Sequence, residues 1–211
     1  KPMIGRLLAL ATASLLAIAS PVPALATVIT YDADLSGVSS PGVGYTLVTY
    51  DDLAHTLQLD VTFSGLLGPT TAAHIHCCIA PPGTTTVATQ VPSFVGFPLG
   101  VTAGTYVSPQ FDLTLASSWN PSFVTAHGGT PAGAEAALAA GLAAGWAYLN
   151  IHTSVYPGGE IRGFLQACGP GTSNVCGTPT SGVPEPGAIA LLGFGLAGLA
   201  ASRRRRRTNR R

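Results

Sequence analysis

The chain has 211 residues, of which 46% are hydrophobic and only 9% are charged, and its formal net charge is +1. That average hides two unlike regions, because residues 27–182 hold eight acidic residues and a single basic one, Arg162, for a formal charge of −7. A segment this acidic is not expected to bind nucleic acid or anionic lipid. Its length and its Thr-, Gly- and Pro-rich composition favour one folded β domain.

The first 26 residues have the pattern of a secretion signal. An uncharged apolar run, residues 7–19, follows a short basic segment and leads to the small residues Ala24-Leu25-Ala26, where a signal peptidase cuts. The run is too short to span a bilayer. The alternative is a buried N-terminal helix, which the two prolines after the run would interrupt. We therefore expect signal peptidase to remove residues 1–26.

Eight short segments of residues 27–168 alternate in polarity or are rich in β-branched residues, and turn residues bound them, as is typical of β-strands. They are residues 27–35, 45–50, 56–63, 71–78, 105–107, 110–115, 147–152 and 159–166. Eight short strands favour an all-β fold, an antiparallel two-sheet sandwich. Asp51-Asp52 and Tyr156-Pro157-Gly158-Gly159 contain turn residues, so each predicts a hairpin.

One segment departs from the strand pattern. Residues 131–144 are rich in alanine, with Thr130 placed as an N-cap and Pro131 at the first helical position. They predict a short helix that crosses between the sheets. Residues 169–182 are rich in Gly, Ser, Thr and Pro and predict a flexible linker that follows the domain.

All four cysteines lie in the acidic part of the chain, where an oxidising exterior would favour disulfides. Three pairings exist. Neighbours on a strand point to opposite faces, so we favour Cys77 and Cys78 each reaching a different one of Cys168 and Cys176. The alternative joins Cys77 to Cys78 and Cys168 to Cys176.

The C-terminal part has three features in order. Val183-Pro184-Glu185-Pro186 is followed by an uncharged apolar segment, residues 187–202, and then by an arginine-rich segment, residues 203–211. The apolar segment predicts a transmembrane helix of about 24 Å. This helix is shorter than the hydrocarbon core of a bilayer, which is about 30 Å thick, but long arginine side chains can reach the headgroups and reduce the mismatch. Arginines beside such a helix stay in the cytoplasm, which places the domain outside. A nucleic-acid patch is disfavoured because no aromatic residues interleave the arginines.

This order of features resembles the PEP-CTERM sorting signal of Gram-negative bacteria, over residues 183–211. The resemblance implies that exosortase, a membrane-embedded protease, cuts near the Pro-Glu-Pro and releases or transfers the protein to the outer surface, often alongside exopolysaccharide. We therefore expect an exported protein with an intermediate anchored in the inner membrane and a final location at the cell surface or outside the cell. The expected partners are signal peptidase, exosortase, the inner membrane, and an exopolysaccharide or another surface protein.

Three blocks, Ala73-His74-Ile75-His76, Tyr148 to Thr153 and Tyr156 to Gly163, resemble the CHRD domain. The resemblance spans about residues 30–166. It implies an extracellular, all-β binding or structural module, not a reaction. The sequence contains no nucleophile elbow, phosphate loop or paired catalytic carboxylates. Our first hypothesis is therefore a module that is not an enzyme and has no catalytic residue and no cofactor.

Histidines carry the second hypothesis, a metal-binding domain or metalloenzyme. Strand periodicity places His74 and His76 on one face, and His152 on one face of another strand. If those strands are neighbours, three imidazoles could hold zinc or copper and leave one position open. The arrangement is similar in outline to copper-zinc superoxide dismutase, although the further ligands of that enzyme are not recognisable. Alternatively, the histidines donate to backbone carbonyls, Asn150 or Thr153 and organise a polar core.

Glu160 and Arg162 share a strand face. Because Arg162 is the only basic residue in residues 27–182, we expect its guanidinium to form a structural ion pair inside the protein. One arginine cannot make a basic patch, so this expectation is favoured over ligand recognition.

Overall fold

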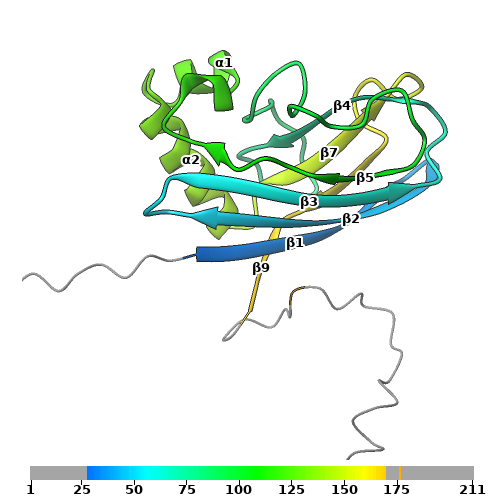
Figure 1. The fold of residues 1–211 in the computed structure, drawn as a ribbon, viewed down its shortest axis with the longest axis horizontal. Coiled ribbons are helices and arrows are strands. Elements are labelled where there is room, and N and C mark those ends of the chain that lie inside the picture. The colour runs from blue at the N-terminus through cyan, green and yellow to red at the C-terminus, as the bar shows by residue number, and fades with distance from the viewer. Residues whose placement is uncertain (1–27, 170–175, 177–211) are drawn as a thin grey trace, which may run out of the picture.

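The computed structural model describes residues 28–169 and Cys176 (Figure 1). The predicted signal peptide, nearly all of the predicted linker, and the predicted sorting signal with the transmembrane helix expected in it lie outside these residues. Within the described part of the chain, none of the helices has the length and apolar composition that crossing a membrane requires.

The described strands join into one curled antiparallel sheet (Figure 1). Its order is β4-β7-β8-β1-β2-β3-β5, with β6 paired to β3 and β9 paired to β1. The strands are β1 (Val28–Gly37), β2 (Ser40–Asp51), β3 (Thr56–Ser64), β4 (Thr70–His76), β5 (Gly104–Val107), β6 (Phe111–Asp112), β7 (Tyr148–Thr153), β8 (Ile161–Phe164) and β9 (Gln166–Cys168). The mostly β class is confirmed; in place of the expected two sheets, the described strands form one curled sheet. Local alternation is the same in both arrangements, so it cannot distinguish them.

Each predicted segment contains a strand, and both hairpins form. The largest difference is at residues 110–115, where only β6 is extended and the chain then turns into the short helix η1 (Ala116–Ser118). Residues 159–166 divide between β8 and the start of β9. The hairpin turn closes through a hydrogen bond of 3.0 Å from the Gly159 amide to the Tyr156 carbonyl.

The predicted alanine-rich helix is α2 (Pro131–Ala143). The Thr130 side chain accepts from the Gly133 amide at 3.1 Å, and Pro131 begins the helix, as expected. Such a cap contributes about 1 kcal/mol. A second short helix, α1 (Pro121–Ala126), was not predicted; the Asn120 side chain caps it. Figure 1 shows α1 and α2 together at one end of the sheet.

The sheet curls around a single apolar core to which strands from both ends of its order contribute. In β3, Leu57, Leu59, Val61 and Phe63 are buried, whereas Asp60 between them is exposed. Strand β7 differs because five of its six residues are buried. Leu149 and Ile151 face the core, and Tyr148, Asn150 and His152 lie on the opposite face. That second face, shared with β4, carries the candidate site.

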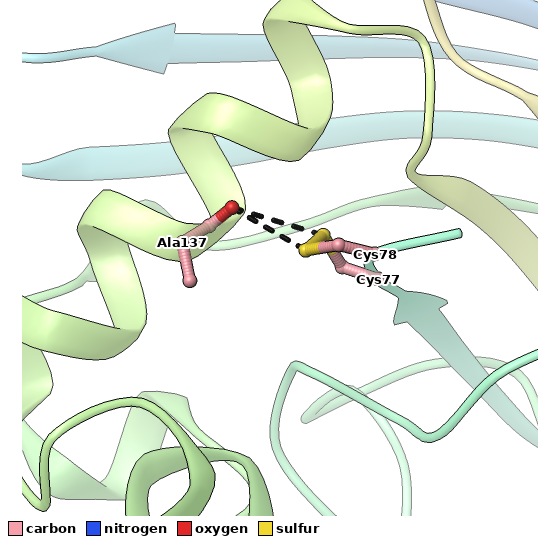
Figure 2. Close-up of a disulfide and its surroundings, with 3 residues drawn as sticks. All are labelled: Cys77, Cys78 and Ala137. Carbon is pink, nitrogen blue, oxygen red and sulfur yellow. Dashed lines mark hydrogen bonds between the residues drawn. A yellow bond between two sulfur atoms is a disulfide. The ribbon is translucent and has the colours of Figure 1, made fainter. Parts of the chain in front are cut away.

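The disulfides join Cys77 to Cys78 and Cys168 to Cys176. The favoured pairing between the middle and the end of the domain is therefore wrong. That prediction assumed that both Cys77 and Cys78 belong to a strand, but β4 ends at His76, so the alternation of side chains no longer applies. Figure 2 shows both sulfurs against the carbonyl oxygen of Ala137 in α2, at 3.9 and 3.3 Å.

Glycine in α2 makes room for this pair of sulfurs. A Cβ atom at Gly141 would overlap the Cys77 sulfur. Glycine has low helical propensity, but at position 141 it lets the helix pack closely against the Cys77–Cys78 disulfide.

Candidate metal centre

Strands β4 and β7 are direct neighbours, which is the condition under which the three histidines converge. Their register pairs His74 with Asn150, His76 with Tyr148 and Ala72 with His152. Because alternate residues of a strand share a face, all three imidazoles stand on the same side of the sheet. One ring nitrogen from each lies within 4.8 Å of the other two. His74 and His76 are 6% and 7% exposed, and His152 is partly exposed.

One nitrogen of each ring is held by a backbone carbonyl. His74 Nε2 lies 2.8 Å from the Pro92 oxygen, His76 Nδ1 2.8 Å from the Thr85 oxygen, and His152 Nδ1 2.8 Å from the Pro157 oxygen. A carbonyl oxygen can only accept, so each of these ring nitrogens carries the proton. The tautomer of each neutral ring is thereby fixed, with its lone pair on the other nitrogen.

The nitrogens that carry the lone pairs of His76 and His152 lie next to each other, and a ring nitrogen of His74 lies within 4.8 Å of the ligand nitrogens of both. His76 Nε2 and His152 Nε2 are 3.4 Å apart, and neither carries a proton to share. His74 Nδ1 is buried and has no hydrogen-bond partner. Two nitrogen ligands at about 2.0–2.1 Å from a tetrahedral ion would lie about 3.3–3.4 Å apart. The distance of 3.4 Å between His76 Nε2 and His152 Nε2 matches that value.

Burial keeps the three rings neutral. It lowers the pKa of His74 to about 4, against the hydrogen bond to Pro92, which acts in the opposite direction. It also lowers the pKa values of His76 and His152 below their ordinary value. Neutral imidazole is the form that binds metal ions, so the cluster keeps its lone pairs available at neutral pH.

Two neighbours on β7 hold the cluster in place. The Tyr148 ring stacks on His76 with 4.8 Å between the ring centroids, and the Tyr148 hydroxyl accepts from the Thr85 amide at 3.1 Å. The Asn150 amide nitrogen donates to the Gly158 carbonyl at 3.1 Å and lies 3.4 Å from His152 Nε2. Hydrogen-bonded neighbours of this kind orient metal ligands and set their basicity.

Gly159 must be glycine at this site. Its φ of +115° is a backbone conformation that side-chain-bearing residues rarely adopt, and a Cβ there would overlap the Asn150 carboxamide.

The other two histidines take no part in the cluster. His55 Nδ1 lies 3.0 Å from both carboxylate oxygens of Glu135, which also accepts from the Tyr50 hydroxyl at 3.1 Å. Glu135 raises the pKa of His55 through this hydrogen bond and through its charge. His127 packs against Phe123 in α1, with 4.3 Å between the ring centroids.

The predicted ion pair between Glu160 and Arg162 does not form. Glu160 instead accepts four hydrogen bonds, from the Ser40 hydroxyl at 2.6 Å, the Thr153 hydroxyl at 2.7 Å, and the amides of Leu67 at 2.5 Å and Gly68 at 3.3 Å. Burial alone would raise the pKa of Glu160, but these hydrogen bonds outweigh it and hold the pKa below its ordinary value. Hydrogen bonds from uncharged donors therefore stabilise the ionised Glu160 carboxylate, the role that the prediction assigned to Arg162.

Residues 26–165 match the CHRD domain family, and residues 182–206 match the PEP-CTERM protein-sorting motif. The chain belongs to the CHRD domain family. Both resemblances seen in the sequence are thereby confirmed. No curated protein and no solved structure matches this chain.

The sorting motif identifies the CHRD protein as an exported protein that exosortase, a membrane protease, processes. The histidine cluster lies wholly inside the CHRD match, on β4 and β7. The three carbonyls that fix its tautomers come from Thr85, Pro92 and Pro157. No sequence pattern predicts these carbonyls, because any residue can supply a backbone carbonyl.

Proposed function

We propose that this CHRD protein is a surface module that binds one transition-metal ion at His74, His76 and His152. The observation that carries the proposal is a cluster of three imidazoles, in which one ring nitrogen of each lies within 4.8 Å of the other two. His76 Nε2 and His152 Nε2 are 3.4 Å apart, and the buried His74 Nδ1 has no hydrogen-bond partner. Hydrogen bonds to carbonyls account for one nitrogen of each ring, as a purely structural polar core would require. They leave the other nitrogen of each ring without a carbonyl partner. Among the described residues, the Asn150 amide, 3.4 Å from His152 Nε2, is the donor next to them.

The donor set favours zinc or copper. Imidazole nitrogen suits both ions, whereas calcium and magnesium take oxygen ligands. Three ligands leave a fourth position for water or another ligand, and a bound ion would act there as a Lewis acid. The chain's own residues contribute fixed tautomers, two buried ligands, His74 and His76, and a second layer of hydrogen bonds. We assign no reaction, so the module functions as a binding or structural protein at the cell surface or in the extracellular matrix.

Metal analysis of the purified full chain tests this proposal. The protein should retain about one zinc or copper ion per chain after dialysis against buffer and should lose it to a strong chelator. A protein that stays metal-free after incubation with both ions, and is equally stable with and without them, contradicts the proposal. That result would leave the first hypothesis, a binding module without metal.

Processing by exosortase gives a separate prediction. Replacing Pro184, Glu185 and Pro186 by alanines should leave the protein uncut in the inner membrane, because the protease reads this motif. Pulse-chase labelling followed by membrane fractionation measures the uncut form. A matched triple-alanine change at Thr178-Pro179-Thr180, in the preceding segment, should be processed normally. Unchanged release of the Pro-Glu-Pro variant would contradict the prediction.

A further inference from the structure

A small cavity lies beside the histidine cluster on the same face of the sheet. Its volume is about 260 Å³, and it lies between the β1–β2 turn, the β7–β8 turn and β8. Its lining includes Asn150, Arg162 and the carboxylate residue Glu160. The oxygens of Glu160 already accept hydrogen bonds from Ser40, Leu67, Gly68 and Thr153, whereas Arg162 keeps free donors.

Arg162 brings a positive charge to this cavity. It is the only basic residue between positions 28 and 169, and no carboxylate of the described residues lies within ion-pair distance of it. Its Nη2 donates to the Pro82 carbonyl at 3.1 Å, and its guanidinium lies over the Tyr148 ring, 5.6 Å from the centroid. A guanidinium has five N–H donors in a planar fork, so donors remain after the contact with Pro82.

The register of the sheet connects this charge to the proposed metal site. Cross-strand pairs place His74, Asn150 and Arg162 in one row across β4, β7 and β8. Asn150 belongs to both places, because it lines the cavity and its amide nitrogen lies 3.4 Å from His152 Nε2. The cavity therefore adjoins the metal site through a single side chain.

We infer that the cavity binds a small carboxylate or carbonate-type oxyanion, held by Arg162 beside the metal. The inference rests on the proposed function. Three neutral imidazoles leave the charge of a divalent ion uncompensated, and Arg162 adds another positive charge, so the two together favour an anion. The planar fork of the guanidinium matches the two oxygens of a carboxylate. The remaining acidic surface would repel larger polyanions, which favours a small ligand.

Acetate binding to the copper-loaded full chain tests the inference. Copper(II) is paramagnetic, so acetate held beside it should show faster relaxation of its methyl protons in a saturable titration. In Arg162→Gln the affinity for acetate should fall at least about tenfold, because charge-assisted hydrogen bonds are lost, while the copper content stays unchanged. Arg162→Lys should lie between the two. Gln58→Glu on β3 makes the same change of net charge away from the cavity and should bind acetate normally.

Each other outcome overturns a stated claim. A copper-loaded chain that shows no saturable acetate effect, or equal affinity in Arg162→Gln, contradicts the anion site alone. A chain that takes up no copper contradicts the proposed function, and the anion site with it.

Discussion

His76→Ala should abolish metal binding and leave the sheet folded. The side chain supplies one of the three clustered ring nitrogens, and its removal leaves two ligands that cannot enclose the ion. The affinity for zinc should fall at least about 100-fold, because losing even a hydrogen-bond partner of a ligand costs about 10- to 100-fold. Elemental analysis after dialysis, together with competition against a colorimetric chelator, measures both the stoichiometry and the affinity.

His55→Ala is the matched control. It removes the same side chain from a site outside the cluster, where His55 is about half exposed and bonds to Glu135. The metal content of this variant should equal that of the wild type. Equal metal content in His76→Ala and the wild type would mean that the ion binds elsewhere.

Thermal unfolding separates a metal ligand from a histidine with a structural role. A ligand that binds only the folded state at 100 times its Kd adds about 2.7 kcal/mol to the free energy of unfolding. Zinc should therefore raise the Tm of the wild type and of His55→Ala but not that of His76→Ala. If His76 served only to organise a polar core, its removal would lower the Tm of the metal-free protein, and zinc would shift none of the three.

The sequence predicts that His74 and His76 share one face of a strand, but it does not predict that His152 and the three backbone carbonyls complete the cluster. Strand periodicity alone placed His74 beside His76. The neighbour relation of β4 and β7 was only a condition in that prediction, because these strands are far apart in the chain and many strand orders fit the same pattern. The direction of the lone pairs depends on the carbonyls of Thr85, Pro92 and Pro157, which loop packing places there.

Two predictions were wrong because they depend on where the tertiary fold places loops and strand ends, which local sequence patterns do not specify. The disulfide pairing was wrong because a rule for strands was applied to Cys77 and Cys78, which follow the end of β4. The ion pair was wrong because opposite charge was taken as the main partner for Glu160. A buried carboxylate can be compensated equally well by neutral donors. Loop amides and hydroxyls supply that compensation here, and their approach is a result of the tertiary fold.

Glu160→Gln should be among the most destabilising single changes in the domain. The carboxylate joins three segments, since its donors lie at Ser40 at the start of β2, at Leu67 and Gly68 in the loop before β4, and at Thr153 at the end of β7. An amide NH₂ in place of one oxygen would face donors instead of accepting from them. Hydrogen bonds to charged groups are worth about 1.5–3 kcal/mol, and an unsatisfied buried donor costs about 1–3 kcal/mol. We expect a loss of about 2–4 kcal/mol at neutral pH.

The difference in free energy of unfolding between wild type and Glu160→Gln should depend on pH in a defined direction. The folded-state pKa of Glu160 is depressed, so its ionised form contributes stability above the unfolded pKa of about 4.3. That contribution is lost as the pH falls through the folded pKa. Urea unfolding should therefore show a large gap between wild type and Glu160→Gln at neutral pH and a narrower gap in acid. Asp60→Asn neutralises an exposed carboxylate on β3 and should change stability by less than about 0.5 kcal/mol. A gap that stays constant with pH would mean that the charge on Glu160 is not what joins the three segments.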